Sequence, residues 1–374
     1  MEISILHDVA VSPNFAQKDK DSMCAYPQIA LMANDTIACL YRCGTTKYSS
    51  DGRLMMQLST DNGFLWSTPL NVFDGNKNSP REAVCCGGIA AGSSGELFVN
   101  FFTTLETPAE TYLFSKEGKS LKRKISVIKS SDQGQSWSQA KSINFAPYQN
   151  VGTPTSPFEL PDGRLCFPIE AETDKGVQSS VSVFSTIDCN EFTPININAG
   201  DNNGRFNYCD AHYTILDNGN ILMLLWTFVQ ENEETINVHK SYSADNGLTW
   251  STPEPTPIKG QVTVPLAHSS GKLIAATNYR DYPEGIYLWV SEDNGTSWAK
   301  DSFVMWNERK KQITGTKSPN ISKEHKNEGV WEALQGFTFG TPDLKELNDG
   351  SILMSYYATL DNIVHVRACR FKII

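Results

Sequence analysis

The sequence predicts an all-β protein, a propeller of six four-stranded antiparallel blades. Two observations carry this prediction: an eight-residue motif occurs four times along the 374 residues, and a shorter turn phrase occurs six times between apolar runs. The apolar runs are rich in Ile, Leu, Phe, Tyr and Val, which favour strands, whereas amphipathic helix patterns are scarce. Internal repeats of this length are typical of propellers and arrays, so the whole chain is expected to form one repetitive domain over residues 1–374.

The eight-residue motif reads Ser-x-Asp-x-Gly-x-x-Trp and occurs at residues 59–66, 130–137, 243–250 and 291–298. Its Asp can accept backbone N–H bonds and its Gly tolerates positive φ, which together predict a tight turn. The Trp then returns to the apolar side, where its indole N–H can find a partner. Residues 185–192 keep the leading Ser and an aromatic end, and they are interpreted as a decayed copy.

The turn phrase places Asn/Asp-Gly, Ser-Gly or a similar pair before an apolar run, at residues 34–42, 94–102, 162–170, 218–226, 270–278 and 349–357. Such pairs between apolar runs are hairpin signals, so each phrase is expected to join the first and second strands of a blade. The N-terminal run 3–11 is expected to supply the outer strand of the last blade and close the ring. Residues 105–124 and 301–336 depart from the repeat and are expected to be surface excursions, either solvated loops or a substrate lid.

The Ser-x-Asp-x-Gly-x-x-Trp motif is identified as the Asp box, also called the bacterial neuraminidase repeat. On these motifs nearly the whole chain resembles the sialidase superfamily of β-propellers, and the stretch 339–357 is similar to the last blade of many of its members. The resemblance implies that the boxes lie between the outer strands of each blade, far from the active site. Sialidases bind the substrate carboxylate with three arginines, and the first lies in a Tyr/Phe-Arg-Ile-Pro phrase. The matching phrase here has Ala25 in the arginine place and Pro27 in the proline place.

Polar residues recur at one position of the predicted first strands, seven residues before the turn Gly. They are Gln28, Ser156, His212 and Asp343. A polar group amid apolar neighbours is costly unless it faces a wet cavity or partners, which predicts a channel site. Asp210 is two residues before His212 and is expected to share its face, and Glu82 is a looser candidate. The structural alternatives are a satisfied core histidine for His212 and backbone-amide caps for Asp210 and Asp343.

The ends of the predicted second strands give a second aligned set of residues: Arg42, Phe102, Glu170, Trp226, Asn278 and Tyr357. Charged and aromatic side chains on one rim suit a sugar, and Arg42 and Arg280 could hold a substrate carboxylate or serve structural ion pairs. Glu170 and Glu172 should lie on one side, where each would raise the pKa of the other. Packing is the alternative role for Tyr357.

These residues lead to the hypothesis of an exo-acting glycoside hydrolase that removes a terminal sugar, acidic sugars included, and that is not a standard sialidase. Glu170 or Asp210 would be the general acid and Asp343 or Glu82 the second carboxylate. His212 would bind a hydroxyl or tune the acid. The substrate-binding set would be Gln28, Arg42, Glu82, Ser156, Trp226, Arg280 and Tyr357. Two alternatives stay open: a polysaccharide lyase on uronate-containing chains, with His212 or a Tyr as the base, and a carbohydrate-binding propeller without catalysis.

The composition limits the partners and the compartment. A net charge of −10 argues against nucleic-acid binding, and no run of about 18 apolar residues predicts a membrane span. The nine cysteines lack zinc-ligand spacing and read as reduced core thiols, so neither a metal nor an organic cofactor is expected. No signal peptide is visible, which predicts a cytoplasmic protein; a secreted or periplasmic protein with its leader removed would begin in the same way.

Overall fold

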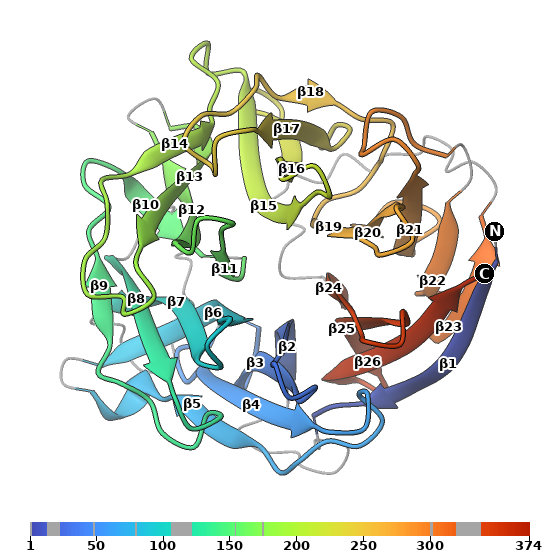
Figure 1. Ribbon diagram of the computed structural model, residues 1–374, viewed down its shortest axis with the longest axis horizontal. Helices are drawn as coiled ribbons and strands as arrows, with labels where there is room; N and C mark the ends of the chain where they lie inside the picture. The colour runs from blue at the N-terminus through green and yellow to red at the C-terminus, as the bar shows by residue number, and fades with distance from the viewer. Residues whose placement is uncertain are drawn as a thin grey trace.

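The computed structural model describes residues 2–12, 23–47, 49–78, 81–105, 122–153, 155–173, 176–299, 302–318 and 338–374. Within these residues the chain forms 26 strands and one 3₁₀ turn, η1 (Gly75–Lys77), so the all-β prediction is confirmed. The strands form antiparallel sheets arranged as a ring, and the colours follow the chain once around it (Figure 1). No described helix has the length and apolarity needed to cross a membrane.

The largest sheet has eight strands in two halves, which a single parallel bridge between Met23 and Val364 joins. One half contains β24 (Phe339–Glu346), β25 (Ile352–Leu360), β26 (Ile363–Ile373) and β1 (Ile3–Ala10). The other half contains β2 (Met23–Leu31), β3 (Ile37–Gly44), β4 (Arg53–Ser59) and β5 (Leu70–Phe73).

The other four sheets follow in chain order. The first contains β6 (Glu82–Ala91), β7 (Leu97–Leu105), β8 (Arg123–Ser130) and β9 (Lys141–Ile143). The second contains β10 (Gln149–Gly152), β11 (Phe158–Glu159), β12 (Leu165–Glu172), β13 (Gln178–Ser185) and β14 (Asn196–Ala199). The third contains β15 (Phe206–Ile215), β16 (Ile221–Val229), β17 (His239–Ser243) and β18 (Glu254–Pro255). The fourth contains β19 (Thr263–Ala267), β20 (Leu273–Tyr279), β21 (Gly285–Ser291), β22 (Phe303–Asn307) and β23 (Gln312–Lys317).

Each turn phrase lies where the sequence predicts it, between the innermost strand of a set and the next strand, as between β15 and β16. The second strands are buried on both faces because neighbouring sheets cover them; every residue of β3 and of β20 is buried. The hydrophobic clusters therefore lie between sheets, and one of them joins Phe102 and Val127 to Phe167 and Val181 of the following sheet. Strands β2, β6, β15, β19 and β24 lie nearest the centre of the ring (Figure 1).

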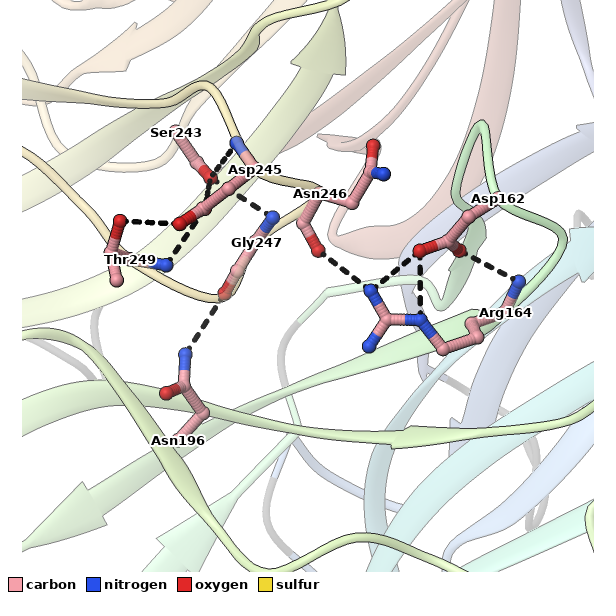
Figure 2. Close-up of polar contacts among 8 residues, drawn as sticks. All are labelled: Asp162, Arg164, Asn196, Ser243, Asp245, Asn246, Gly247 and Thr249. Carbon is pink, nitrogen blue, oxygen red and sulfur yellow. Dashed lines mark hydrogen bonds and ion pairs between the residues drawn. The ribbon is translucent and has the colours of Figure 1, made fainter.

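The Asp boxes form the predicted turns between the third and fourth strands, and Figure 2 shows the box between β17 and β18. The Asp245 carboxylate accepts the Thr249 N–H at 2.8 Å, and the Ser243 hydroxyl accepts the Gly247 N–H at 2.9 Å. Gly247 has φ 81°, and the Trp250 indole donates to its carbonyl at 3.0 Å. The decayed copy keeps the same place between β13 and β14, where Ser185 and Phe192 form an isolated bridge.

The boxes also connect neighbouring sheets, a role that the motif alone does not predict. Arg164 donates to the Asn246 carbonyl at 3.3 Å and Asn196 to the Gly247 carbonyl at 2.9 Å, so the turn before β12 and the start of β14 hold the next box (Figure 2). The glycine of the first box, Gly63, lies so close to Leu353 of β25, in the other half of the eight-stranded sheet, that a Cβ would come within 2.8 Å of its side chain. A box therefore spaces neighbouring sets of strands as well as forming a turn.

The N-terminal strand pairs with the C-terminal strand, as the sequence predicts. Strand β1 runs antiparallel to β26, from Ile3 opposite Ile373 to Ala10 opposite Arg367, so the two chain ends lie side by side (Figure 1). Asp8 of β1 forms an ion pair with Arg367 at 2.7 Å and accepts the Tyr356 hydroxyl at 2.9 Å.

The structure tests only part of the two predicted surface excursions. Residues 106–121 of the first lie outside the described residues, as do 319–337 of the second. Within 302–318, however, strands β22 and β23 extend their sheet instead of forming a solvated loop, and a Cβ on Gly315 would lie 3.3 Å from the side chains of Ile3 and Ile5. The prediction of a surface excursion is wrong for this part, because its apolar residues pack against β1.

Candidate active site

A β-bulge recurs at one place in the innermost strands. In β2, β6, β10, β15 and β24 the pairing with the next strand shifts by one residue. Tyr26, Asn150, Asp210 and Thr341 occupy the bulges of four of these strands, with φ of 58°, 48°, 43° and 43°. A non-glycine residue at such φ costs on the order of 1–3 kcal/mol, and a bulge re-aims a side chain that regular alternation would place elsewhere.

The side chain of Glu170 contacts the backbone of Asp210 beside the innermost strands, and the two carboxyl groups interact electrostatically. Glu170 lies on β12 opposite Gly152, and its Oε1 accepts a hydrogen bond from the backbone N–H of Asp210. Both side chains are half-buried. Burial raises the pKa of Glu170 to about 8, and the charge of Asp210 adds to this rise. Burial also raises the pKa of Asp210 to about 6, although Arg280 and Lys47 oppose it. At neutral pH one carboxyl is therefore protonated and the other ionised.

Two basic residues, Lys47 and Arg280, lie near enough to Asp210 to lower its pKa. Lys47 follows β3, is only 7% exposed, and has its Nζ 5.7 Å from the ring centroids of both Tyr26 and Tyr357. Arg280 follows β20 and donates to the Gln261 side chain and, at 3.2 Å, to the Phe339 carbonyl. Burial lowers the pKa of Lys47 well below its ordinary value, and the charge of Arg280 adds to this effect.

Two tyrosines, Tyr26 and Tyr357, lie beside these basic residues. The rings of Tyr26 and Tyr357 meet edge to face with centroids 5.9 Å apart. Tyr357 is fully buried, which raises the pKa of its hydroxyl, while the neighbouring Arg280 acts in the opposite direction. A third cation, Arg123, donates to the Val151 carbonyl at 3.0 Å, and its charge lowers the pKa of Glu170.

We call six of these residues the axial cluster: Tyr26, Lys47, Glu170, Asp210, Arg280 and Tyr357. They come from separate segments of the chain, which the ring brings together. The sequence predicts four of them, namely Glu170, Asp210, Arg280 and Tyr357, and misses Tyr26 and Lys47. Tyr26 occupies the same bulge position as Asp210, so shifting the alignment of the first strands by two residues would have found it. Lys47 lies in a connection, where strand alignment gives no signal. Among the described residues, no group of three His, Cys, Asp or Glu side chains could hold a metal ion.

The aligned first-strand residues Asp343, Ser156 and Gln28 form a second set of hydrogen bonds, separate from the axial cluster. The Asp343 carboxylate accepts the Ile29 N–H at 2.8 Å and the Leu344 N–H at 2.9 Å. Ser156 donates to the Gln28 side chain at 2.8 Å, and its hydroxyl accepts the Ile89 N–H at 3.1 Å. These bonds tie neighbouring sheets together, and for Asp343 they match the alternative of a backbone-amide acceptor.

His212 lies away from the carboxylate pair. It is 3% exposed, and burial lowers its pKa to about 3, with Lys345 as its charged neighbour. The charged neighbours of Asp210 are instead Arg280 and Lys47. The expectation that Asp210 and His212 share one face is wrong, because the extra residue in the β15 bulge interrupts the alternation between them.

Three further candidates are engaged elsewhere. Glu82 accepts the Thr103 hydroxyl at 3.0 Å and pairs with Lys124 at 3.2 Å. Trp226 is 6% exposed and its indole donates to Thr235 at 3.3 Å. The third, Arg42, is 1% exposed and binds backbone carbonyls. These contacts favour structural roles over direct substrate contact.

The fold and the axial cluster define an all-β ring with acidic, basic and aromatic groups gathered at its centre. The sequence profile of the BNR repeat-like domain matches residues 35–353. The chain therefore belongs to the family of BNR repeat-like domains. Among curated proteins, none matches it.

Solved structures share this fold at low sequence identity. A protein of unknown function from Dyadobacter fermentans is 15% identical over all of both chains, with a TM-score of 0.75. A Hadza microbial sialidase is 14% identical, with a TM-score of 0.69 over 94% of this chain and 66% of its own. An α-L-arabinanase from Penicillium chrysogenum, solved with arabinobiose, is 13% identical, with a TM-score of 0.63 over 98% of this chain and 97% of its own. At these identities the similarity shows the fold alone.

Proposed function

We propose that this protein is an exo-acting glycoside hydrolase that removes a terminal acidic sugar from a glycan or oligosaccharide. The observation that carries the proposal is the hydrogen bond from the Asp210 backbone N–H to the Glu170 carboxyl, together with pKa values raised to about 8 for Glu170 and about 6 for Asp210. Paired carboxyl groups of unequal pKa are what glycoside hydrolysis needs, one as a proton donor and one as a base or nucleophile.

In the proposed reaction Glu170 is protonated at neutral pH and gives its proton to the glycosidic oxygen as the C–O bond breaks. Asp210 stays ionised and stabilises the positive charge that develops on the sugar ring. A water molecule then supplies the hydroxyl group of the new sugar product, and its remaining proton restores the acid. Glu170 is thus the general acid of the two candidates, and Asp210 replaces Asp343 and Glu82 as the second carboxylate.

The acidic substrate follows from the basic half of the axial cluster. Lys47 and Arg280 both act electrostatically on Asp210, so a carboxylate on the sugar would meet two cations at the centre of the ring. Tyr26 and Tyr357 add aromatic surface of the kind that packs against a sugar ring. The sialidase and the arabinanase that share the fold carry names of glycan-cleaving enzymes, which is compatible with this proposal.

The fold that we propose around this site is a single closed six-bladed propeller over residues 1–374. In this interpretation the eight-stranded sheet counts as two blades, because only the Met23–Val364 bridge joins its halves. Strand β1 then supplies the outer strand of the last blade through its pairing with β26.

The test is a screen of acidic and neutral aryl glycosides and oligosaccharides, with mass detection of the products. We expect hydrolysis of an acidic substrate with a bell-shaped pH dependence, rising near pH 6 as Asp210 ionises and falling near pH 8 as Glu170 loses its proton. Glu170→Gln should lower kcat by about 10²–10⁴-fold and remove the alkaline limb. An unsaturated product would instead identify a lyase, and glycan binding with no turnover would identify a sugar-binding propeller.

A further inference from the structure

Arg42 directs its guanidinium group to three backbone carbonyls. Nε donates to Val84 O at 3.0 Å, Nη1 to Thr46 O at 2.8 Å and Nη2 to Ser49 O at 2.6 Å. The side chain is only 1% exposed. Buried charges cost much free energy unless hydrogen bonds satisfy them. The three bonds therefore hold both the guanidinium group and the backbone that carries the three carbonyls in place.

Two glycines make room for this arrangement. A Cβ on Gly44 would lie 2.9 Å from Arg42 Nη1, and a Cβ on Gly52 would lie 2.5 Å from Nη2. The guanidinium thus packs directly on the backbone at both ends of the connection between β3 and β4. It also reaches across to Val84 of β6, so the connection is anchored to the next sheet.

Lys47 is the residue that this connection carries into the axial cluster. It follows Thr46, whose carbonyl binds Arg42, and it precedes Ser49, whose carbonyl binds the same guanidinium. Thr45 and Thr46 are exposed, whereas Lys47 is 7% exposed and lies 5.7 Å from the ring centroids of Tyr26 and Tyr357. Burying a lysine is unfavourable, so the connection must be held in place for the side chain to stay inside.

We propose that Lys47 contacts the substrate in the axial cluster and that Arg42 is the positioning residue that places it there, by binding the carbonyls on both sides of Lys47. Arg42 was expected to hold the substrate itself. Its three carbonyl bonds assign it this indirect role instead. The inference rests on the proposed function for the substrate contact, whereas the positioning can be tested without any substrate.

The substrate-free test uses limited trypsin digestion of the whole folded protein, with mass spectrometry to follow cleavage after Lys47. We expect the buried Lys47 to be protected in the parent protein. Arg42→Gln should accelerate this cleavage at least about tenfold, because loss of one hydrogen bond to a charged group changes an equilibrium by about that factor. The matched control is Arg164→Gln, an arginine that also binds a carbonyl but lies at the turn before β12 (Figure 2); it should leave Lys47 protected.

If Arg42→Gln does not fold, Gly44→Ala displaces the guanidinium while keeping the arginine, and the same cleavage is expected. Full protection of Lys47 in a folded variant of either kind overturns the positioning role.

The kinetic test uses an acidic aryl glycoside. Lys47→Met and Arg42→Lys should each raise KM about tenfold with little change in kcat, since both remove binding of the substrate. In the Lys47→Met background, Arg42→Lys should add less than about twofold, because the two residues act as one unit. Additive effects would show that Arg42 does not act through Lys47. Failure of every glycoside to react, with Lys47 exposed only when Arg42 is changed, would refute the hydrolase and retain the positioning role.

Discussion

At the scale of single residues, the protein keeps two carboxyl groups where they are costly. Glu170 and Asp210 are half-buried, and burial is the largest cause of the raised pKa of each. A catalytic group whose ordinary environment would be water is commonly a source of instability. Such a cost is expected at an active site and would be hard to explain in a purely structural core.

This cost predicts a pH-dependent gain in stability for Glu170→Gln. The pKa of Glu170 is about 8 in the folded protein against an ordinary value of 4.5, so the folded state binds the proton more tightly than the unfolded state. Stability from this group is therefore fully present below about pH 4.5 and is lost progressively as the pH rises from there to about 8. The neutral Gln avoids this loss, so its Tm relative to the parent should rise with pH.

The measurement is the Tm of the parent and of Glu170→Gln at several pH values between about 4.5 and 8. Glu292→Gln, which changes an exposed carboxylate on the outer rim, is the control and should show no such rise. A difference in Tm that is the same at every pH would contradict a buried, protonated Glu170.

At the scale of elements, the repeated Asp box determines how neighbouring sheets approach each other. Its Ser and Asp bonds are local and follow from the motif, whereas its glycine packs on a distant side chain, Gly247 on Phe184 of the preceding sheet and Gly63 on Leu353 in the other half of the eight-stranded sheet. Two constraints therefore favour glycine at this position: the positive φ of the turn and the close approach of a distant side chain.

A pair of glycine substitutions separates the two reasons. Gly63 and Gly163 both have φ of +82°, but a Cβ on Gly63 would lie 2.8 Å from Leu353, whereas a Cβ on Gly163 would meet nothing within 4 Å. Gly163→Ala should cost about 1 kcal/mol from backbone strain alone. Gly63→Ala should cost about 1–3 kcal/mol more, from overpacking.

Urea denaturation of the two variants measures this difference in the free energy of unfolding. Equal costs would show that the boxes do not space the sheets and that only their φ matters.

At the scale of the whole molecule, the contact between the first and last strands decides whether the ring holds together. Asp8 links β1 to β26 and β25 through Arg367 and Tyr356. Both charged side chains are mostly buried, with 17% and 13% of their surface exposed. Removing one partner would leave the other charge without compensation.

We therefore expect Asp8→Ala to destabilise the whole fold by about 2–4 kcal/mol. Glu292→Ala, which removes the exposed ion pair with Lys272, should have no measurable effect. Thermal unfolding followed by circular dichroism checks this, and a normal Tm for Asp8→Ala would mean that the ring does not depend on this contact.

The sequence by itself determines the repetitive part of this protein. Turn chemistry and apolar runs are local signals, so the hairpins, the Asp boxes and the pairing of the first strand with the last could be predicted from residue types and spacing. Two residues of the axial cluster, Glu170 and Tyr357, could also be aligned, because these second-strand ends keep the same register opposite Gly152 and Gly340. Asp210 and Arg280 each lie two residues from an aligned position.

Only the tertiary structure decides which polar residues meet. The bulge in β15 separates Asp210 from His212 although they are two residues apart, and the ring brings Glu170 to Asp210 across 40 positions. Lys47 is held in the cluster because Arg42 binds the carbonyls of Thr46 and Ser49 on either side of it. Such contacts produce no repeating pattern in the sequence. A sequence pattern depends on neighbours along the chain, whereas a bulge, a ring of sheets and a buried guanidinium bring together segments that are far apart in the sequence.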